Sequence, residues 1–242
     1  MSLLPLRRPC WLQQRPCCLL CDEPAEPGHP PICSPCETDL PWLGSHCRVC
    51  ALPLPLADMS CGACLSKPPS FSRVEAPWRY AFPVDSLITR FKHQSHWPIG
   101  HLLGELLAEH LRHAFDEGLT RPDLLLPVPL ARQRQRQRGF NQAAMLARWL
   151  SKPLDLPLQL HWLQRVIDTP AQQQLDAATR KRNLRHAFAL APGSQVKSLH
   201  LALIDDVLTT GATAERLARL LLDAGAARVD VYCLARTPKP GD

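Results

Sequence analysis

The 242-residue chain has no long apolar run, few aromatic residues and none of the common cofactor or hydrolase motifs. No apolar run reaches the roughly 18 to 20 residues that a transmembrane helix needs. The first residues, MSLLPLRRPCW, lack an apolar core and a cleavage site, so we expect no signal peptide and a cytoplasmic protein. Walker A, Gly-x-Gly-x-x-Gly, Gly-x-Ser-x-Gly and His-Glu-x-x-His patterns are also absent. The usual motif evidence for P-loop, dinucleotide, hydrolase and metalloprotease folds is therefore missing.

Cysteine is abundant but unevenly distributed. Ten of the eleven cysteines precede residue 65, in a proline-rich region with little apolar periodicity. Eight of them form four Cys-x-x-Cys pairs, and two such pairs complete a tetrahedral four-thiolate zinc site. The predicted zinc ligands are Cys18, Cys21, Cys33, Cys36, Cys47, Cys50, Cys61 and Cys64. We expect two structural zinc ions whose binding supplies folding energy to a module that has no core of its own.

The sequence leaves the pairing of these cysteines open. Pairing in chain order would use the first two pairs for one site and the last two for the other, but interleaved pairing is also possible. Cys17 could replace Cys18 as a ligand, and disulfides are the competing explanation of the whole pattern. Cys233, in a late strand-like run, is expected to be a buried thiol.

The segment LALIDDVLTTGAT, Leu201 to Thr213, contains the strongest functional pattern. A short apolar run leads into two carboxylates, a Thr-rich turn with one glycine and then a helical pattern, which predicts a buried strand, an acidic strand end, a loop and a helix N-terminus. Hydroxyls and backbone N–H groups at a helix N-terminus suit a phosphate. Two adjacent carboxylates can accept hydrogen bonds from sugar hydroxyls or position Mg²⁺. The ligand that this pattern describes is a ribose 5-phosphate.

A second strand-loop-helix pattern precedes it. DLLLPVP, residues 123–129, predicts a buried parallel strand, followed by the basic stretch LARQRQRQRGFNQ and a helix. Ligands collect at the carboxyl ends of such strands. The four alternating arginines, Arg132, Arg134, Arg136 and Arg138, are interpreted as an anion-binding loop, with an exposed strand edge as the alternative.

LALIDDVLTTGAT resembles the PRPP-binding motif of the type I phosphoribosyltransferases at every position. The Pro-Val-Pro strand end with Arg138, Gly139, Phe140, Asn141 and Gln142, the cysteine-rich module, the Phe91-Lys92 step and the series from Arg165 to Phe188 narrow the resemblance to the ComF/GntX family. The resemblance covers essentially the whole chain.

The resemblance implies specific roles for these residues. Asp205 and Asp206 would be the catalytic pair and, with Thr209, Thr210, Gly211, Ala212 and Thr213, would bind PRPP together with Mg²⁺. Candidates for the pyrophosphate side or a mobile loop are Arg136, Arg138, Gly139, Asn141, Gln142, Gln172 and Arg180. The middle segment is polar and could close as a lid, or be a plain surface loop.

The expected fold is α/β, of the type I phosphoribosyltransferase kind, with a mostly parallel, Rossmann-like sheet flanked by helices. We divide the chain into a double zinc ribbon (1–66), a connection (67–84) and a phosphoribosyltransferase domain (85–242). Three functions remain open: a PRPP-dependent transferase that releases pyrophosphate to an unknown acceptor, a PRPP-sensing regulator without turnover, and a competence protein that handles single-stranded DNA in the cytoplasm with other competence proteins. The DNA hypothesis predicts salt-dependent binding that weakens when Arg134 and Arg136 become Ala.

Overall fold

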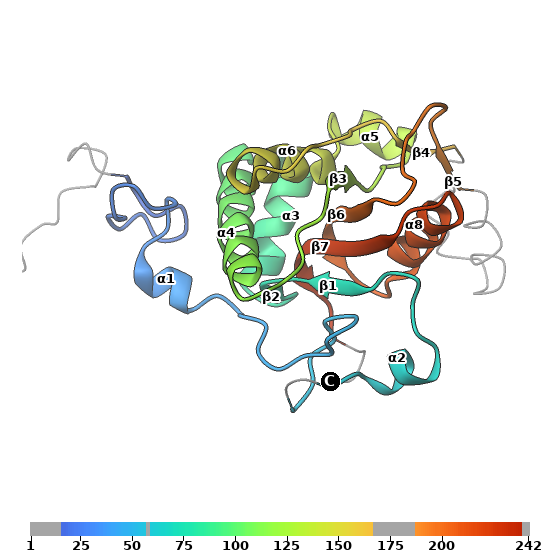
Figure 1. Cartoon of the computed structure of the whole chain (residues 1–242). Coiled ribbons are helices and arrows are strands. Elements are labelled where there is room, and N and C mark those ends of the chain that lie inside the picture. The colour runs from blue at the N-terminus through green and yellow to red at the C-terminus, as the bar shows by residue number, and fades with distance from the viewer. Residues whose placement is uncertain (1–15, 57–58, 167–186, 239–242) are drawn as a thin grey trace, which may run out of the picture.

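A parallel sheet lies at the centre of the molecule, as the computed structural model of residues 16–56, 59–166 and 187–238 shows (Figure 1). The strand order is β1 (Arg73–Glu75), β7 (Arg228–Arg236), β6 (His200–Leu208) and β3 (Leu124–Pro127). β2 (Trp78–Arg79) follows β1 along the same edge of β7, and every pairing in this sheet is parallel. β6 and β7 are buried along nearly their whole length because helices cover both faces of the sheet.

The helices divide between the two faces, as the apolar patterns of the sequence predict. α3 (Val84–Gln94), α4 (Trp97–Asp116) and α6 (Gln142–Leu154) cover one face, and α8 (Ala212–Asp223) covers the other (Figure 1). Alternate residues of β7 serve the two cores: Tyr232 and Leu234 belong to the cluster on the α4 side, and Val231 and Cys233 to the cluster on the α8 side. Cys233 is fully buried, as predicted.

Two parts of the chain differ from the sequence-based expectation. Residues 67–84, expected as a plain connection, contain β1 and β2, whose three and two residues are too short for a periodic signal and are separated by Pro77. The stretch Arg132–Arg138 forms a short helix, α5, so both the expected loop and the alternative of an exposed strand edge are wrong. Because only Arg and Gln occur in α5, the segment has no apolar stripe by which its helical period could be recognised.

A small antiparallel pair, β4 (Leu163–Arg165) and β5 (Phe188–Leu190), lies outside the main sheet. The chain between these two strands holds the predicted lid segment. Gln172 and Arg180 belong to it and lie outside the described residues.

The cysteine-rich region joins the sheet at its β1–β2 edge and at the end of β7. It has two short helices, α1 (Ser34–Thr38) and α2 (Gly62–Ser66), each starting directly after a cysteine. The backbone N–H of Leu43 donates to Pro77 O at 2.7 Å, and that of Arg79 donates to Pro41 O at 2.8 Å. Arg236, the last residue of β7, donates from Nε to Cys50 O at 2.8 Å. The region is therefore held to the sheet by hydrogen bonds on both sides.

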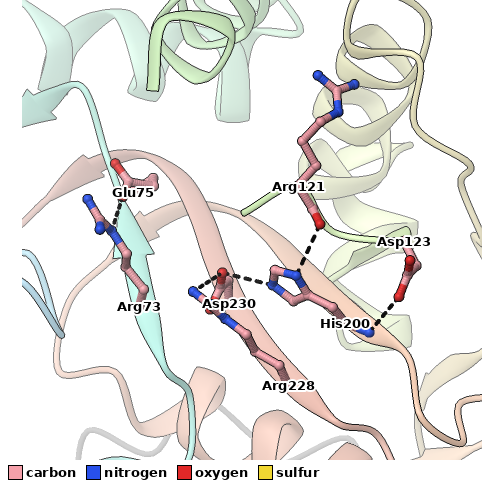
Figure 2. A network of polar contacts seen from close by, with 7 residues as sticks. All are labelled: Arg73, Glu75, Arg121, Asp123, His200, Arg228 and Asp230. Atoms are coloured by element: carbon pink, nitrogen blue, oxygen red, sulfur yellow. Dashed lines mark hydrogen bonds and ion pairs between the residues drawn. The ribbon is translucent and has the colours of Figure 1, made fainter. Parts of the chain in front are cut away.

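A network of charged side chains lies at the amino ends of the central strands (Figure 2). Asp230 is fully buried, accepts from Arg228 Nε at 3.0 Å and lies 2.9 Å from His200 Nε2. Nδ1 of His200 faces Arg121 O at 3.2 Å, and Asp123 accepts from the backbone N–H of His200 at 2.8 Å. The network ties β3, β6 and β7 together at the edge opposite the predicted ligand site.

Within the described part of the chain, none of the helices combines the length and the apolar character required to cross a membrane.

Candidate functional site

A pocket of about 300 Å³ lies at the carboxyl ends of β3 and β6, where the parallel-sheet rule places ligands. Its wall comes from both of the strand-loop-helix patterns that the sequence analysis singled out. β6 and the start of α8 contribute Asp205, Asp206, Thr209 and Thr213. The segment that follows β3 contributes Arg134, Arg138, Asn141 and Gln142, among others. The fold thus brings the two predicted anion-binding regions to one cavity.

The acidic pair lies within β6, which continues to Leu208, and not at the strand's end as expected. Neighbouring strand residues point to opposite faces, so the two carboxylates have different surroundings. Asp206 is buried and its Oδ1 lies 3.0 Å from Nζ of Lys92 on α3. Asp205 accepts a hydrogen bond from the backbone N–H of Asp206 at 2.9 Å.

The pair is electrostatically unfavourable without a ligand. Burial, followed by the negative charge of Asp206, raises the pKa of Asp205 to about 7, and Lys92 opposes this only in part. Oδ2 of Asp206 is buried and has no hydrogen-bond partner among the residues that the structure describes. A divalent cation or the hydroxyls of a sugar would supply the positive charge or the donors that these oxygens lack.

The loop that follows β6 forms the entry to α8. Thr209 and Thr213 lie in the pocket wall, and Gly211 occupies the N-cap with φ of 75°, a left-handed conformation that glycine adopts without strain. The hydroxyl oxygen of Thr210 faces the backbone N–H of Ala212 at 3.4 Å. The predicted phosphate loop therefore has the expected form, with two of its three threonines at the cavity.

The helical form of α5 separates its arginines into two sets. Residues four apart share a helix face, so Arg134 and Arg138 line the pocket together. Arg136, which was predicted for the pyrophosphate side, lies half a turn away, is exposed and is not among the lining residues. Gly139 ends the helix with φ of 80°. Arg165 of β4 adds a further guanidinium to the wall.

Asn141 and Gln142 were both predicted for the pyrophosphate side or a mobile loop, but their side chains make different contacts. Asn141 caps α6, because its Oδ1 accepts from the backbone N–H of Ala143 at 3.0 Å and its Nδ2 donates to Val128 O at 3.0 Å. It therefore fastens α6 to the end of β3. The side chain of Gln142 is buried at 6% exposure and lines the pocket, and its Oε1 has no partner within the described part of the chain.

The sequence analysis did not predict Lys92 and Tyr80 as site residues, although both line the pocket. Lys92 lies in the last turn of α3, where a basic residue is ordinarily explained by the helix dipole. Its neighbour Phe91 is fully buried. The sequence feature that could have indicated Lys92 as a site residue is therefore its position next to an apolar core residue. Tyr80 follows the unpredicted strand β2, and no pattern marked it.

The eight predicted cysteine ligands form two groups of four sulfur atoms, each in chain order. One group is Cys18, Cys21, Cys33 and Cys36, and the other is Cys47, Cys50, Cys61 and Cys64. Within each group the Sγ atoms all lie within 4.8 Å of one another. Cys17 belongs to neither group. Among the described residues the pairing is therefore sequential, and the interleaved alternative is wrong.

The donor set of each group fits a thiolate-bound metal. Burial raises the pKa of Cys18, but backbone N–H groups directed at its sulfur outweigh that effect and lower the pKa to about 7. The same balance lowers the pKa of Cys47 to about 7, with Cys61 N–H donating to Cys47 Sγ at 3.2 Å. Burial and the neighbouring sulfurs raise the pKa of Cys36 and Cys64, so four thiolates need a compensating charge. A tetrahedral zinc ion with no open position would supply that charge.

Known proteins resemble the chain over most of its length. The DNA utilization protein YhgH of Escherichia coli (strain K12) is 39% identical over 221 residues, which cover 91% of this chain and 96% of that protein. Competence protein F of Haemophilus influenzae is 36% identical over 207 residues, 85% of this chain and 90% of that protein. The chain belongs to the ComF/GntX family. Competence protein ComFC of Bacillus subtilis, 35% identical over 115 residues, covers 47% of this ComF/GntX chain and 45% of its own length. No family model matches.

Solved phosphoribosyltransferases overlap with part of this ComF/GntX protein. A purine phosphoribosyltransferase from Pyrococcus horikoshii is 20% identical with a TM-score of 0.38 and covers 58% of this chain and 75% of its own. A hypoxanthine phosphoribosyltransferase from Staphylococcus aureus is 15% identical with a TM-score of 0.39 and covers 56% and 64%. The structure confirms the α/β class that the sequence predicted: a parallel central sheet with helices on both faces and a cysteine-rich module before it.

Proposed function

We propose that this ComF/GntX protein binds PRPP with Mg²⁺ in the pocket beside Asp205 and Asp206. One observation carries the proposal: a single cavity is lined by the Thr-rich start of α8, by the acidic pair of β6 and by two arginines of α5. The start of α8, with Thr209 and Thr213, suits a 5-phosphate, and the start of α6 with Arg134 and Arg138 suits a diphosphate. A sugar that carries a phosphate, a diphosphate and a diol matches this set of groups.

The chemistry at the centre of the site would be electrostatic. Mg²⁺ would bring the positive charge that the carboxylates of Asp205 and Asp206 lack and would contact the ribose hydroxyls or the diphosphate. If pyrophosphate departs, positive charge develops on the sugar ring, where the acidic pair stabilises it, while the arginines stabilise the leaving group. A pyrophosphate-release assay over candidate acceptors separates a transferase from a sensor that binds PRPP without turnover.

The test of PRPP binding is calorimetric titration of the zinc-loaded, full-length protein with PRPP and Mg²⁺. The double variant Asp205→Asn, Asp206→Asn should bind at least about tenfold more weakly, a loss of about 1.4 kcal/mol. A matched control, Asp116→Asn with Asp223→Asn, removes two exposed carboxylates outside the pocket wall and should bind like the wild type. A folded wild type that does not bind PRPP would overturn the proposal.

A second proposed function, in competence and in the handling of single-stranded DNA in the cytoplasm, rests on α5. The names of the relatives refer to competence and DNA utilization, and the exposed Arg136 projects from α5 on the side opposite the pocket arginines. Exposed guanidinium groups bind a phosphate backbone without reading its sequence.

The helix allows the two functions to be tested separately. Arg136→Ala should weaken binding of an oligothymidylate and lower the salt dependence of that binding by about one phosphate contact, with PRPP affinity unchanged. Arg134→Ala should weaken PRPP binding more than DNA binding. Equal losses of DNA affinity in both variants would mean that the strand contacts the pocket face of α5 as well, and no loss in either would remove α5 from the DNA surface.

We also propose that each cysteine group holds one structural zinc ion. Metal analysis of the purified protein should find two zinc ions per chain. Because both sites are closed by four thiolates, the zinc ions would stabilise the module and its hydrogen bonds to β2 and β7 without taking part in group transfer.

A further inference from the structure

Gln142 has the chemistry of a residue that reads a sugar hydroxyl, although its position in the sequence predicted the pyrophosphate side. Its side chain is only 6% exposed and lines the pocket, and none of the described residues provides a hydrogen-bond partner for its Oε1. A buried amide oxygen without a partner loses its hydrogen bonds to water and gains none in return, so a native structure rarely leaves one unpaired without a reason.

The missing partner must be a donor. A diphosphate coordinated by arginines and a metal ion presents only acceptor oxygens, so it cannot satisfy Oε1 of Gln142. A sugar hydroxyl can donate to the amide oxygen and still accept a hydrogen bond or coordinate a metal ion. Oδ2 of Asp206, also buried, unpartnered and in the pocket wall, has the same need. Two acceptors without donors therefore contribute to one cavity.

The backbone around Gln142 holds it in place at that cavity. The Asn141 side chain caps α6 and bonds to Val128 O, so the first turn of α6 is fastened to the end of β3. Gln142 is the first residue of that helix. Its side chain is thus positioned by a hydrogen-bonded cap, as a specificity residue requires.

We propose that Gln142 accepts a hydrogen bond from the 2-hydroxyl of the phosphoribosyl ligand and makes the site select ribose over 2-deoxyribose. The inference rests on the proposed function, because it takes the order of groups in the pocket from it. Gln142 lies on the α5–α6 side, which is assigned to the diphosphate on C1, and the hydroxyl nearest to C1 is the one on C2. Sites built to hydrogen-bond a hydroxyl reject the analogue that lacks it.

The experiment compares ribose 5-phosphate with 2-deoxyribose 5-phosphate, titrated calorimetrically into the zinc-loaded protein with Mg²⁺. The two ligands carry the same phosphate, so the ratio of their affinities isolates the hydroxyl. The wild type should prefer ribose 5-phosphate by about tenfold or more. Gln142→Leu should lower the affinity for ribose 5-phosphate to near that for the deoxy sugar, so that the ratio approaches one.

Two further variants separate the hydroxyl role from other roles. Gln142→Glu keeps an acceptor oxygen and loses the donor, so it should retain the ribose preference even though its charge weakens both ligands. Gln137→Leu removes an exposed glutamine of α5 that does not line the pocket and should leave both affinities unchanged.

An affinity ratio that survives in Gln142→Leu, or equal losses of affinity for both ligands, overturns the inference while leaving phosphoribosyl binding intact. A wild type that binds PRPP but does not discriminate between the two sugars also overturns it. A wild type that binds none of PRPP and the two sugar phosphates overturns the proposed function, and the inference with it.

Discussion

Strands β6 and β7 lie between two clusters of buried charge, one at each end of β6, and the two clusters differ in how their polar atoms are satisfied. At the amino ends, the carboxylate of Asp230 has no solvent contact and is bound by His200 and by Arg228, whose Nη2 lies 2.9 Å from it (Figure 2). At the carboxyl ends, Asp206 forms an ion pair with Lys92, and its second oxygen lies buried with no partner in residues 16–56, 59–166 and 187–238.

The comparison distinguishes a structural role from a binding role by hydrogen-bond accounting. Burying a charge costs free energy unless partners compensate it. At the amino ends the protein supplies those partners itself, and the network links three neighbouring strands. At the carboxyl ends the described residues leave acceptors unpaired at a cavity, and burial, followed by the charge of Asp206, raises the pKa of Asp205. The end with the incomplete set of partners is the one that a ligand can complete.

The largest change in the free energy of unfolding is expected for a substitution of Asp230, and it tests the difference between the two ends. Asp230→Asn removes the negative charge that compensates Arg228 and faces His200, so the free energy of unfolding should fall by about 3–5 kcal/mol. Asp206→Asn is the matched control at the other end. There the lost ion pair with Lys92 is offset by relief from the neighbouring Asp205, so we expect a change below about 1 kcal/mol in either direction.

Urea titrations followed by circular dichroism measure both variants. Asp230→Asn could prove too unstable to purify. In that case its soluble yield at low temperature, compared with that of Asp206→Asn, still ranks the stabilities of the two variants. Equal destabilisation by the two substitutions would contradict the distinction between a satisfied and an unsatisfied end.

The residues that the sequence made recognisable lie close together in the chain. Leu201 to Thr213 contains a strand, a carboxylate pair and a helix start within thirteen residues, so local pattern was enough to predict its form and its place at a ligand pocket. The eight clustered cysteines were recognisable for a similar reason, but their grouping was not, because Cys36 and Cys47 are as close in the chain as Cys50 and Cys61. Even so, the sequence pattern placed the end of this strand too early, because β6 continues through the two adjacent carboxylates to Leu208.

Residues whose role depends on distant partners were not predictable in the same way. Lys92 meets Asp206 across more than a hundred residues of chain, and nothing near Lys92 in the sequence indicates that contact. Gln142 and Asn141 are adjacent and chemically alike, yet one is a helix cap and the other leaves an acceptor at the cavity. Hydrogen-bond accounting of this kind requires coordinates, since it depends on which atoms the fold leaves without a partner.

A substitution of Asp205 is expected to change the free energy of unfolding by less than that of Asp230, and to raise stability instead of lowering it. The folded-state pKa of about 7 lies above the ordinary aspartate value of 3.8, so the folded protein binds this proton more tightly than the unfolded chain does. Stability should therefore be lost as pH rises from about 4 through about 7.

The variant Asp205→Asn has no proton to lose at this position, so at pH 8 it should be more stable than the wild type, by about 1–3 kcal/mol after allowance for partial solvent exposure. At pH 4 the two proteins should differ little. Urea unfolding of both proteins at pH 4 and pH 8 measures this, and pH effects common to both proteins cancel in the difference between them. A variant whose stability follows the wild-type pH dependence would mean that Lys92 already compensates the pair, and the carboxyl end would then be as satisfied as the amino end.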